Sequence, residues 1–329
     1  MIHGRVNQDA GVKRMETAFD KKVFHGCLIR GDVEDAMRYL TRFPEQAQLR
    51  RKYIAVFEEE RYPDLEADSR LQGILRVYQK YYRNVFYLCM DAERAEEAMK
   101  DEFVRLFHMD DSDASFCDIE EREISAAFRS SGYHFLGGRT GGYWGPYIWK
   151  TTESRTYDVA LPGGRQPYTV RFLDGFISKG WCDFISFGEI GTGGWTDGDG
   201  IIHCVKASYD LESESFTVSL LKHEAQHARD LSRHRDMSSG DLEYRAKLVE
   251  LIYSSERNLL QSFIHEADAS KADNGHALAA NRIIEGFAKA QRTDGRPLDA
   301  LRIPEIQAIA KVLLADSDEE IRRKYVETE

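Results

Sequence analysis

The sequence lacks the features that would place the chain in a membrane or disulfide-rich class. It has no apolar run of roughly 18 residues, so no segment is expected to span a membrane. The N-terminus has no apolar stretch of the kind found in a signal peptide. The five cysteines of the chain are scattered and form no C-x-x-C pair, which argues against a cysteine-based zinc site. They are Cys27, Cys89, Cys117, Cys182 and Cys204. These absences predict a cytoplasmic protein with reduced, mostly buried thiols.

An excess of positive charge is also missing. The chain has 45 basic and 56 acidic residues, so its formal net charge is −11. Such a surface repels phosphate groups on average, and we therefore expect no nucleic-acid partner and no anionic membrane partner. Hydrophobic residues make up 42% of the 329 residues, which is enough for a full core and for one to three domains.

Apolar residues recur at helical spacing from about residue 14 to residue 108. Leu71, Ile74, Leu75 and Tyr78, for example, form one stripe at intervals of three and four residues. We therefore expect residues 1–115 to form an all-helical N-terminal domain. The acidic segment 110–115 has few apolar residues and is expected to be its linker.

The pattern changes after residue 130. Segments 147–152, 155–161, 168–173 and 201–205 alternate in polarity or are rich in β-branched residues, which predicts a small, mainly antiparallel sheet. From Leu242 onward the pattern is helical again, and Ser317 begins a capping-box sequence that predicts the start of a last helix. The fold class expected from these patterns is α+β, with residues 116–329 as the second domain.

One short motif carries most of the chemical information. His223, Glu224 and His227 form the pattern H-E-x-x-H in a segment whose apolar residues have helical spacing. Two histidines four residues apart lie on one helix face, about 5–6 Å apart at their bases, so both imidazoles can reach one metal ion. Glu224 then projects beside that ion and can take a proton from a bound water. The motif predicts hydrolysis by metal-activated water, with zinc as the expected ion and manganese or iron as alternatives.

A third protein ligand is expected on the next helix. If the first helix ends near residues 231–233 and an antiparallel helix starts near Asp241, a rise of about 1.5 Å per residue brings Glu243 level with the metal. Glu250 lies two turns further along the same helix face and remains the alternative ligand.

H-E-x-x-H followed by a glutamate in E-x-x-A resembles the gluzincin (thermolysin-like) group of zinc metallopeptidases. The match covers residues 223–246. It implies a zincin-like fold for residues 116–329, zinc held by His223, His227 and Glu243, a peptide or protein substrate, and Glu224 as general base. Two positions depart from the family pattern. Arg229 stands where an apolar residue is usual, and Lys247 replaces an aspartate that orients the first histidine. The residue that orients His223 is therefore not identified.

The remaining parts of such a site are less well determined by the sequence. An oxyanion donor is expected near the second and third helices, and we choose His276, at the start of a helix, from a set of tyrosines and histidines. The other members of that set are Tyr209, Tyr244, Tyr253 and His265. Segment 193–195 could supply an edge strand that pairs with an extended peptide, because its glycines allow close approach. The alternative function is a zincin-like binding or regulatory module with a structural metal or none.

Overall fold

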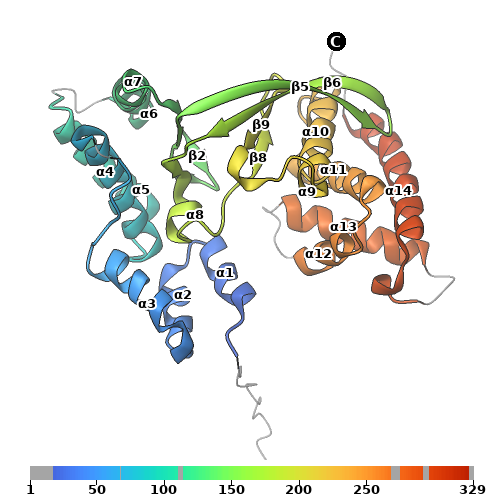
Figure 1. Ribbon diagram of the computed structural model, residues 1–329, viewed down its shortest axis with the longest axis horizontal. Coiled ribbons are helices and arrows are strands. Elements are labelled where there is room, and N and C mark those ends of the chain that lie inside the picture. Colours follow the sequence, from blue (N-terminus) through green and yellow to red (C-terminus); the bar gives the residue numbers. More distant parts are fainter. Residues whose placement is uncertain (1–17, 67, 110–113, 268–274, 292–295, 326–329) are drawn as a thin grey trace, which may run out of the picture. The chain divides into compact units, whose positions relative to one another are not determined.

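The computed structural model describes residues 18–66, 68–109, 114–267, 275–291 and 296–325, and the described residues form mixed α+β structure (Figure 1). The chain divides into two compact units. Unit 1 comprises residues 1–148 and 177–191, and unit 2 comprises residues 149–176 and 192–329. The boundary expected at residue 115 separates two domains that fold independently, and it stays a prediction.

Unit 1 is mostly helical. Several of its helices begin at an aspartate cap: Asp32, Asp68 and Asp91 each accept a backbone N–H of the following first turn. The helices of unit 1 are α1 (Lys21–Ile29), α2 (Val33–Leu40), α3 (Ala47–Tyr53), α4 (Ser69–Phe86), α5 (Ala92–Leu106), α6 (Phe116–Ile119), α7 (Ser125–Ser130) and α8 (Gly180–Ile185), with short helical turns η1 (Pro44–Gln46), η2 (Ile54–Glu58) and η3 (Glu120–Ile124).

Small strands and α8 complete unit 1. β1 (His134–Leu136), β4 (Tyr147–Trp149) and β7 (Ser178–Lys179) form one sheet in the order β1-β4-β7, and β2 (Arg139–Thr140) pairs with β3 (Tyr143–Trp144). The α8 segment packs into the core of the N-terminal helices. Trp181 stacks on Phe86 with ring centroids 4.6 Å apart, and the hydroxyl of Tyr53 donates to the carbonyl oxygen of Ile185 at 2.7 Å.

A four-stranded sheet forms one layer of unit 2. β5 (Thr151–Leu161) and β6 (Gly164–Asp174) pair antiparallel along their whole length as a long hairpin (Figure 1). β6 pairs parallel with β9 (Ile202–Val205), and β9 pairs antiparallel with β8 (Gly194–Thr196). The order β5-β6-β9-β8 places β8 at an edge of the sheet. Because two of these three pairings are antiparallel, the sheet is mainly antiparallel, as predicted.

Helices pack on this sheet and on one another to form the rest of unit 2. The apolar core includes Phe172 from β6, Phe216 from α9 and Phe287 from α13, each of which is buried. The helices are α9 (Glu214–Thr217), α10 (Leu221–Arg233), α11 (Ser239–Tyr253), α12 (Asn258–Glu266), α13 (Gly275–Ala290) and α14 (Ile303–Lys324), with the short turns η4 (Lys206–Ser208) and η5 (Leu298–Ala300).

The structure corrects two expectations from the sequence. Ser317 does not begin the last helix: it is buried inside α14, which starts at Ile303. The thiols are not mostly buried, because Cys89 and Cys117 are exposed, whereas Cys27 and Cys204 are buried. Of the expected linker, residues 110–113 lie outside the described residues, and Ser115 caps α6. No helix among the described residues combines the length and apolar character that a membrane crossing needs.

Candidate metal centre

The two histidines of the motif lie on α10, as predicted. Their rings are 4.5 Å apart between centroids and nearly perpendicular, at 87°. Both side chains are buried, although the C-terminal end of α10 is exposed. Ala225 and Ala228 on the same helix are also buried, and α10 contacts β5, β8 and β9 of the sheet. Small side chains at these positions let the helix lie close to the strands, so the imidazoles are held in a defined position.

The carboxylate of Glu243 reaches both imidazoles from α11. Ser238 caps α11 by accepting the backbone N–H of Asp241, and Glu243 follows on the second turn. Glu243 Oε2 lies 3.4 Å from His223 Nε2, and Glu243 Oε1 lies 3.3 Å from His227 Nε2. One ligand atom from each of the three side chains lies within 4.8 Å of the other two. These residues therefore form a candidate metal-binding group.

The donor set and its spacing fit a divalent metal ion. Two imidazole nitrogens with one carboxylate oxygen are a ligand set that zinc accepts while leaving its fourth position open. In a tetrahedral zinc site with bonds of about 2.0–2.2 Å, two ligand atoms lie roughly 3.3 Å apart. The two nitrogen–oxygen distances of this site, 3.4 and 3.3 Å, are of that size and run to different oxygens of Glu243, so the carboxylate spans both imidazoles. The set also suits manganese or iron, so it does not identify the ion.

Glu250 orients the first histidine, a role that the sequence left unassigned. Its Oε1 accepts a hydrogen bond from His223 Nδ1 at 2.7 Å, and its side chain is buried on α11. Since an ionised carboxylate only accepts, this contact keeps a proton on Nδ1 and turns Nε2 toward Glu243. The corresponding atom of His227, Nδ1, has no hydrogen-bond partner among the described residues.

The histidines and carboxylates of the group shift each other's pKa values. Burial lowers the pKa of His223, but its hydrogen bonds to Glu243 and Glu250 outweigh this effect and raise that pKa above its usual value. Burial raises the pKa of Glu243. Its contacts with His223, His227 and His276 lower that pKa by more than burial raises it, so the pKa of Glu243 is below the usual range. The raised pKa of His223 favours its protonated form when no metal is bound. Metal binding has to displace that proton, which makes the affinity for metal depend on pH.

Glu224 is held by the edge strand of the sheet. The hydroxyl of Thr196, on β8, donates to Glu224 Oε2 at 2.7 Å and lies 3.1 Å from the backbone oxygen of the same residue. Glu224 is itself buried. The sequence did not indicate Thr196, because its position depends on how β8 packs on α10.

His276 lies next to the group at the start of α13. Its Nδ1 is 2.9 Å from Glu243 Oε2, and 55% of its side chain is exposed, so this residue marks the solvent side of the site. Tyr244, another donor considered from the sequence, packs its ring under the Arg282 guanidinium at 3.8 Å and is buried. Burial raises the pKa of Tyr209 to about 12, and the nearby charges of Glu224 and Glu250 contribute to that rise.

The two departures from the gluzincin pattern have structural roles elsewhere in unit 2. The Arg229 guanidinium donates to the carbonyl oxygen of Gly163 in the turn between β5 and β6. Lys247 forms an ion pair with Glu266 of α12 at 2.7 Å, and its ammonium group lies over the ring of Phe263. Both long side chains therefore tie the metal-site helices to neighbouring elements.

The glycines before β8 are required by packing within the chain. A Cβ on Gly193 would overlap the Tyr209 hydroxyl. A Cβ on Gly194 would lie 2.5 Å from the backbone oxygen of His203 and 2.6 Å from Leu220. Segment 194–196 is an edge strand and overlaps segment 193–195, which the sequence suggested as an edge. Its glycines are explained by contacts with the protein itself.

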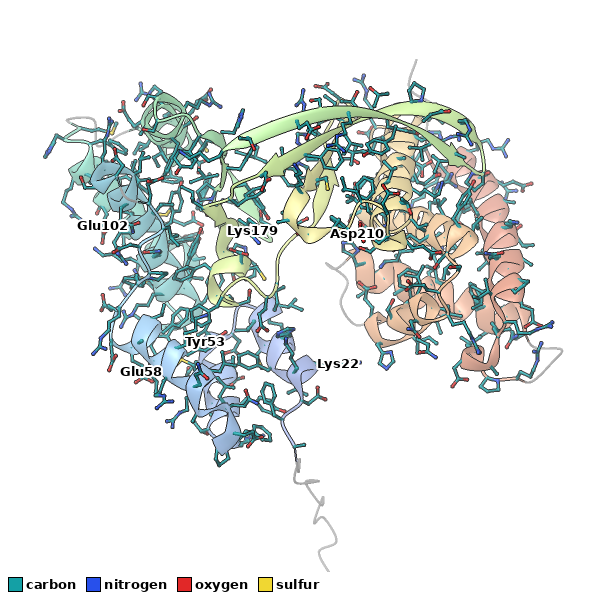
Figure 2. The ribbon with its side chains drawn as sticks, viewed as in Figure 1. Lys22, Tyr53, Glu58, Glu102, Lys179 and Asp210 are labelled. Atoms are coloured by element: carbon teal, nitrogen blue, oxygen red, sulfur yellow. The ribbon has the colours of Figure 1, made fainter. Side chains whose placement is uncertain are left out.

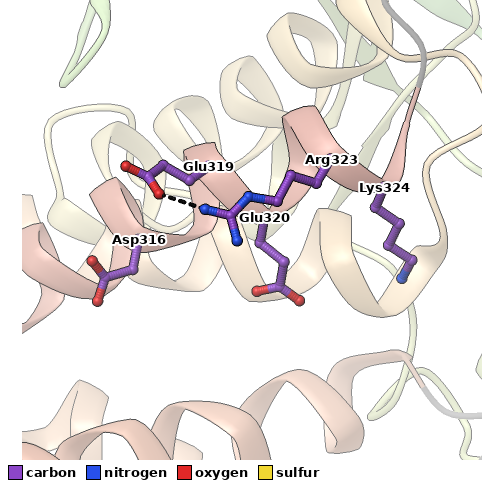
Figure 3. A pocket seen from close by; sticks show the side chains of 5 residues that line it. All are labelled: Asp316, Glu319, Glu320, Arg323 and Lys324. Carbon is purple, nitrogen blue, oxygen red and sulfur yellow. Dashed lines mark hydrogen bonds and ion pairs between the residues drawn. The ribbon is translucent and has the colours of Figure 1, made fainter.

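A separate hollow of about 550 Å³ lies along α14, and no residue of the candidate metal-binding group lines it. Figure 3 shows charged side chains around it, with Arg323 paired to Glu319 at 2.9 Å. All five lining residues belong to one helix: Asp316, Glu319, Glu320, Arg323 and Lys324. This hollow is a charged helix surface and is not connected with the metal group.

Comparison of the chain with protein-family models, with curated proteins and with solved structures gives no match. The function is therefore inferred from the geometry of the site.

Proposed function

We propose that unit 2 is a zinc-dependent peptidase of the gluzincin type. In this proposal His223, His227 and Glu243 hold the ion, and Glu224 is the general base. The observation that carries it is the convergence of two imidazoles and one carboxylate from adjacent helices. The buried Glu224, on the same turn of α10 as these histidines, supports the assignment because a base must lie close to the metal.

The chemistry follows from these positions. A bound zinc ion would lower the pKa of its water to about 7 and polarise the substrate carbonyl. The carboxylate of Glu224 would accept a proton from the attacking water and pass it to the leaving amine. Thr196 donates to one carboxylate oxygen, Oε2, and leaves Oε1 for this proton transfer. The Glu250 carboxylate would stabilise positive charge on His223.

His276 is proposed as the donor that stabilises the oxyanion when water adds to the carbonyl. Its support is its place beside Glu243 and its large exposed fraction, which leaves one ring nitrogen accessible to a substrate. A peptide is the proposed substrate, because β8 pairs with β9 along one side and forms an edge of the sheet beside Glu224. An extended peptide could add to that edge by backbone hydrogen bonds.

The central test is Glu224→Gln in the full-length protein. We expect this variant to bind about one zinc ion per chain, since none of the three ligands is changed, and to hydrolyse a peptide library several orders of magnitude more slowly than wild type. Elemental analysis and a quenched fluorescent peptide assay measure the two properties. Glu212→Gln, on an exposed loop, is the matched control and should keep both.

Two results would contradict this proposal. Undiminished hydrolysis by Glu224→Gln would exclude Glu224 as the base. Zinc binding by the wild type without hydrolysis of any peptide would favour the alternative, a zincin-like binding module with a structural metal.

A further inference from the structure

The backbone groups of β8 are divided between the two sides of this strand. β9 pairs with β8 on one side, and no strand of the described residues lies on the other (Figure 2). The N–H of Val205 donates to the carbonyl oxygen of Gly193 at 2.8 Å. The N–H of Asp197 donates to the carbonyl oxygen of Ile201 at 3.0 Å. Because bonded and non-bonded residues alternate in an antiparallel pair, the odd-numbered residues of this segment face β9 and the even-numbered residues face the open edge.

Two residues of β8 therefore direct their backbone N–H and C=O groups outward, but one of them is already engaged. The Thr192 hydroxyl donates to the carbonyl oxygen of Gly194 at 2.7 Å and lies 3.3 Å from the N–H of Gly194, which donates to it. A threonine side chain that bonds nearby backbone groups in this way takes the place of a partner strand. The outward groups of Thr196 have no such partner within the described part of the chain.

The open backbone position lies beside the proposed general base. The side chain of Thr196 donates to Glu224 Oε2 at 2.7 Å, so a peptide paired with the backbone of Thr196 is held next to that carboxylate. One peptide residue opposite Thr196 can exchange two hydrogen bonds with it. A peptide residue two places further along, opposite Gly194, meets an N–H and a C=O that Thr192 already occupies.

We propose that Thr192 is a specificity-determining residue that restricts backbone pairing of the substrate to Thr196. This inference rests on the peptidase function proposed for unit 2. It defines the substrate class as short peptides, because residues beyond the one opposite Thr196 gain no backbone hydrogen bond from Gly194.

The kinetic test compares peptides of two lengths in the full-length, zinc-loaded protein. A quenched fluorescent peptide that the wild type cleaves is extended by two alanines, at either end in turn. Wild-type KM should change less than about twofold. In Thr192→Ala the groups of Gly194 are free, and extension at one end should lower KM about tenfold, as expected for two neutral hydrogen bonds. The value of kcat should change little, because such pairing is equal in the ground state and the transition state.

Thr192→Ser is the matched control, since it keeps the hydroxyl and should respond to extension like the wild type. Two results would overturn the inference. One is a wild-type KM that already falls about tenfold on extension by alanines. The other is the same dependence on length in folded Thr192→Ala and Thr192→Ser variants.

A binding experiment separates this inference from the proposed function, because it needs no hydrolysis. A blocked alanine pentapeptide is added at saturation to Glu224→Gln and to the double variant Glu224→Gln/Thr192→Ala, and amide hydrogen exchange is followed by NMR. The Thr196 amide should become protected in both proteins, and the Gly194 amide should gain protection only in the double variant.

The outcomes differ for the two proposals. Added protection of Gly194 in the single variant, or none in the double variant, would overturn the role of Thr192 even if the wild type hydrolyses peptides. The expected protection pattern in a protein that hydrolyses no peptide would contradict the peptidase function and support Thr192 as the residue that limits peptide pairing.

Discussion

Two glutamates of α11 have different tasks because they meet different nitrogen atoms of one histidine. Glu243 approaches His223 Nε2, and Glu250 accepts from His223 Nδ1. Spacing along α11 places both residues on the same face, two turns apart, which is why Glu250 was an alternative ligand at the level of sequence. The orientation of the imidazole decides between them, and that orientation exists only in the folded protein.

Loss of the Glu250 carboxylate should weaken metal binding. Glu250→Leu removes the acceptor that holds His223, and we expect the affinity for zinc to fall about 10–100-fold. Glu250→Gln retains a carbonyl acceptor and should lose less. Competition with a fluorescent chelator measures both. A Glu250→Leu variant that folds and binds zinc like wild type would contradict the orienting role.

The Thr196 hydroxyl should affect catalysis through Glu224. Thr196→Val keeps the shape of the side chain but removes a hydrogen bond to a charged group. Such a hydrogen bond typically contributes about 1.5–3 kcal/mol. On the proposed reaction, we expect kcat to fall about tenfold or more with little change in KM. Thr196→Ser keeps a hydroxyl and should restore most of the rate. Equal rates for the valine and serine variants would argue against this contact.

Among the elements, α11 is joined to α13 and to the end of α14 by one buried carboxylate. Asp241 accepts from Arg282 at 2.9 Å, from Lys324 at 2.7 Å and from the Tyr325 hydroxyl at 2.6 Å. The same carboxylate accepts from the Ser238 hydroxyl at the cap of α11. One residue at the first turn of a metal-site helix therefore connects three helices.

This joint should respond to acid in a defined direction. Burial alone would raise the pKa of Asp241, but hydrogen bonds from Lys324, Tyr325 and Ser238 lower it to about 2. A lowered folded-state pKa stabilises the protein above the unfolded value of 3.8, and that contribution is lost as the pH falls toward about 2. At neutral pH it amounts to about 2 kcal/mol.

Chemical denaturation of wild type and Asp241→Asn checks this expectation. The wild type should be more stable at neutral pH, and the difference in unfolding free energy should narrow as the pH is lowered from about 5 to about 3. A difference that stays constant over this range would show that the carboxylate charge is not involved.

The length of α14 shows how packing overrides a local signal. The capping-box pattern at Ser317 predicted a helix start, but the Ser317 hydroxyl donates to the carbonyl oxygen of Leu314 and accepts from Arg245 of α11. Buried residues continue along α14 on both sides of it, at Ile306, Ala310, Leu314 and Ile321. Burial of this stripe contributes more than a helix cap, which is worth about 1 kcal/mol.

At the scale of the whole molecule, unit 1 is completed by a segment that is distant in sequence from its N-terminal helices. Residues 177–191 belong to unit 1, and their α8 contributes Trp181 and Ile185 to its core. Both residues pack against the N-terminal helices through Phe86 and Tyr53. The core of unit 1 therefore combines residues of the N-terminal helices with residues of α8.

A truncation tests this organisation. Deletion of residues 1–110 removes α1 to α5 and leaves the apolar face of α8 without its partners. We expect the truncated chain to bind a hydrophobic dye and to aggregate, because a large apolar patch becomes exposed. Dye fluorescence and size-exclusion chromatography measure this. A monomeric truncated chain with no added dye binding would show that α8 does not need these helices.

The sequence by itself determined the features that depend on local periodicity. His223 and His227 share a face because a helix repeats every 3.6 residues, and the antiparallel partner helix places Glu243 level with them. The mixed α+β class follows from patterns of similar length along the sequence.

Only the tertiary structure decided which distant groups complete the site and the units. Thr196 meets Glu224 across 28 residues, Glu250 meets His223 across 27, and Tyr53 meets Ile185 across 132. Each contact depends on the packing of whole elements. Side-chain periodicity determines the face on which a residue lies, whereas the close packing of that face against another element determines which atoms it meets.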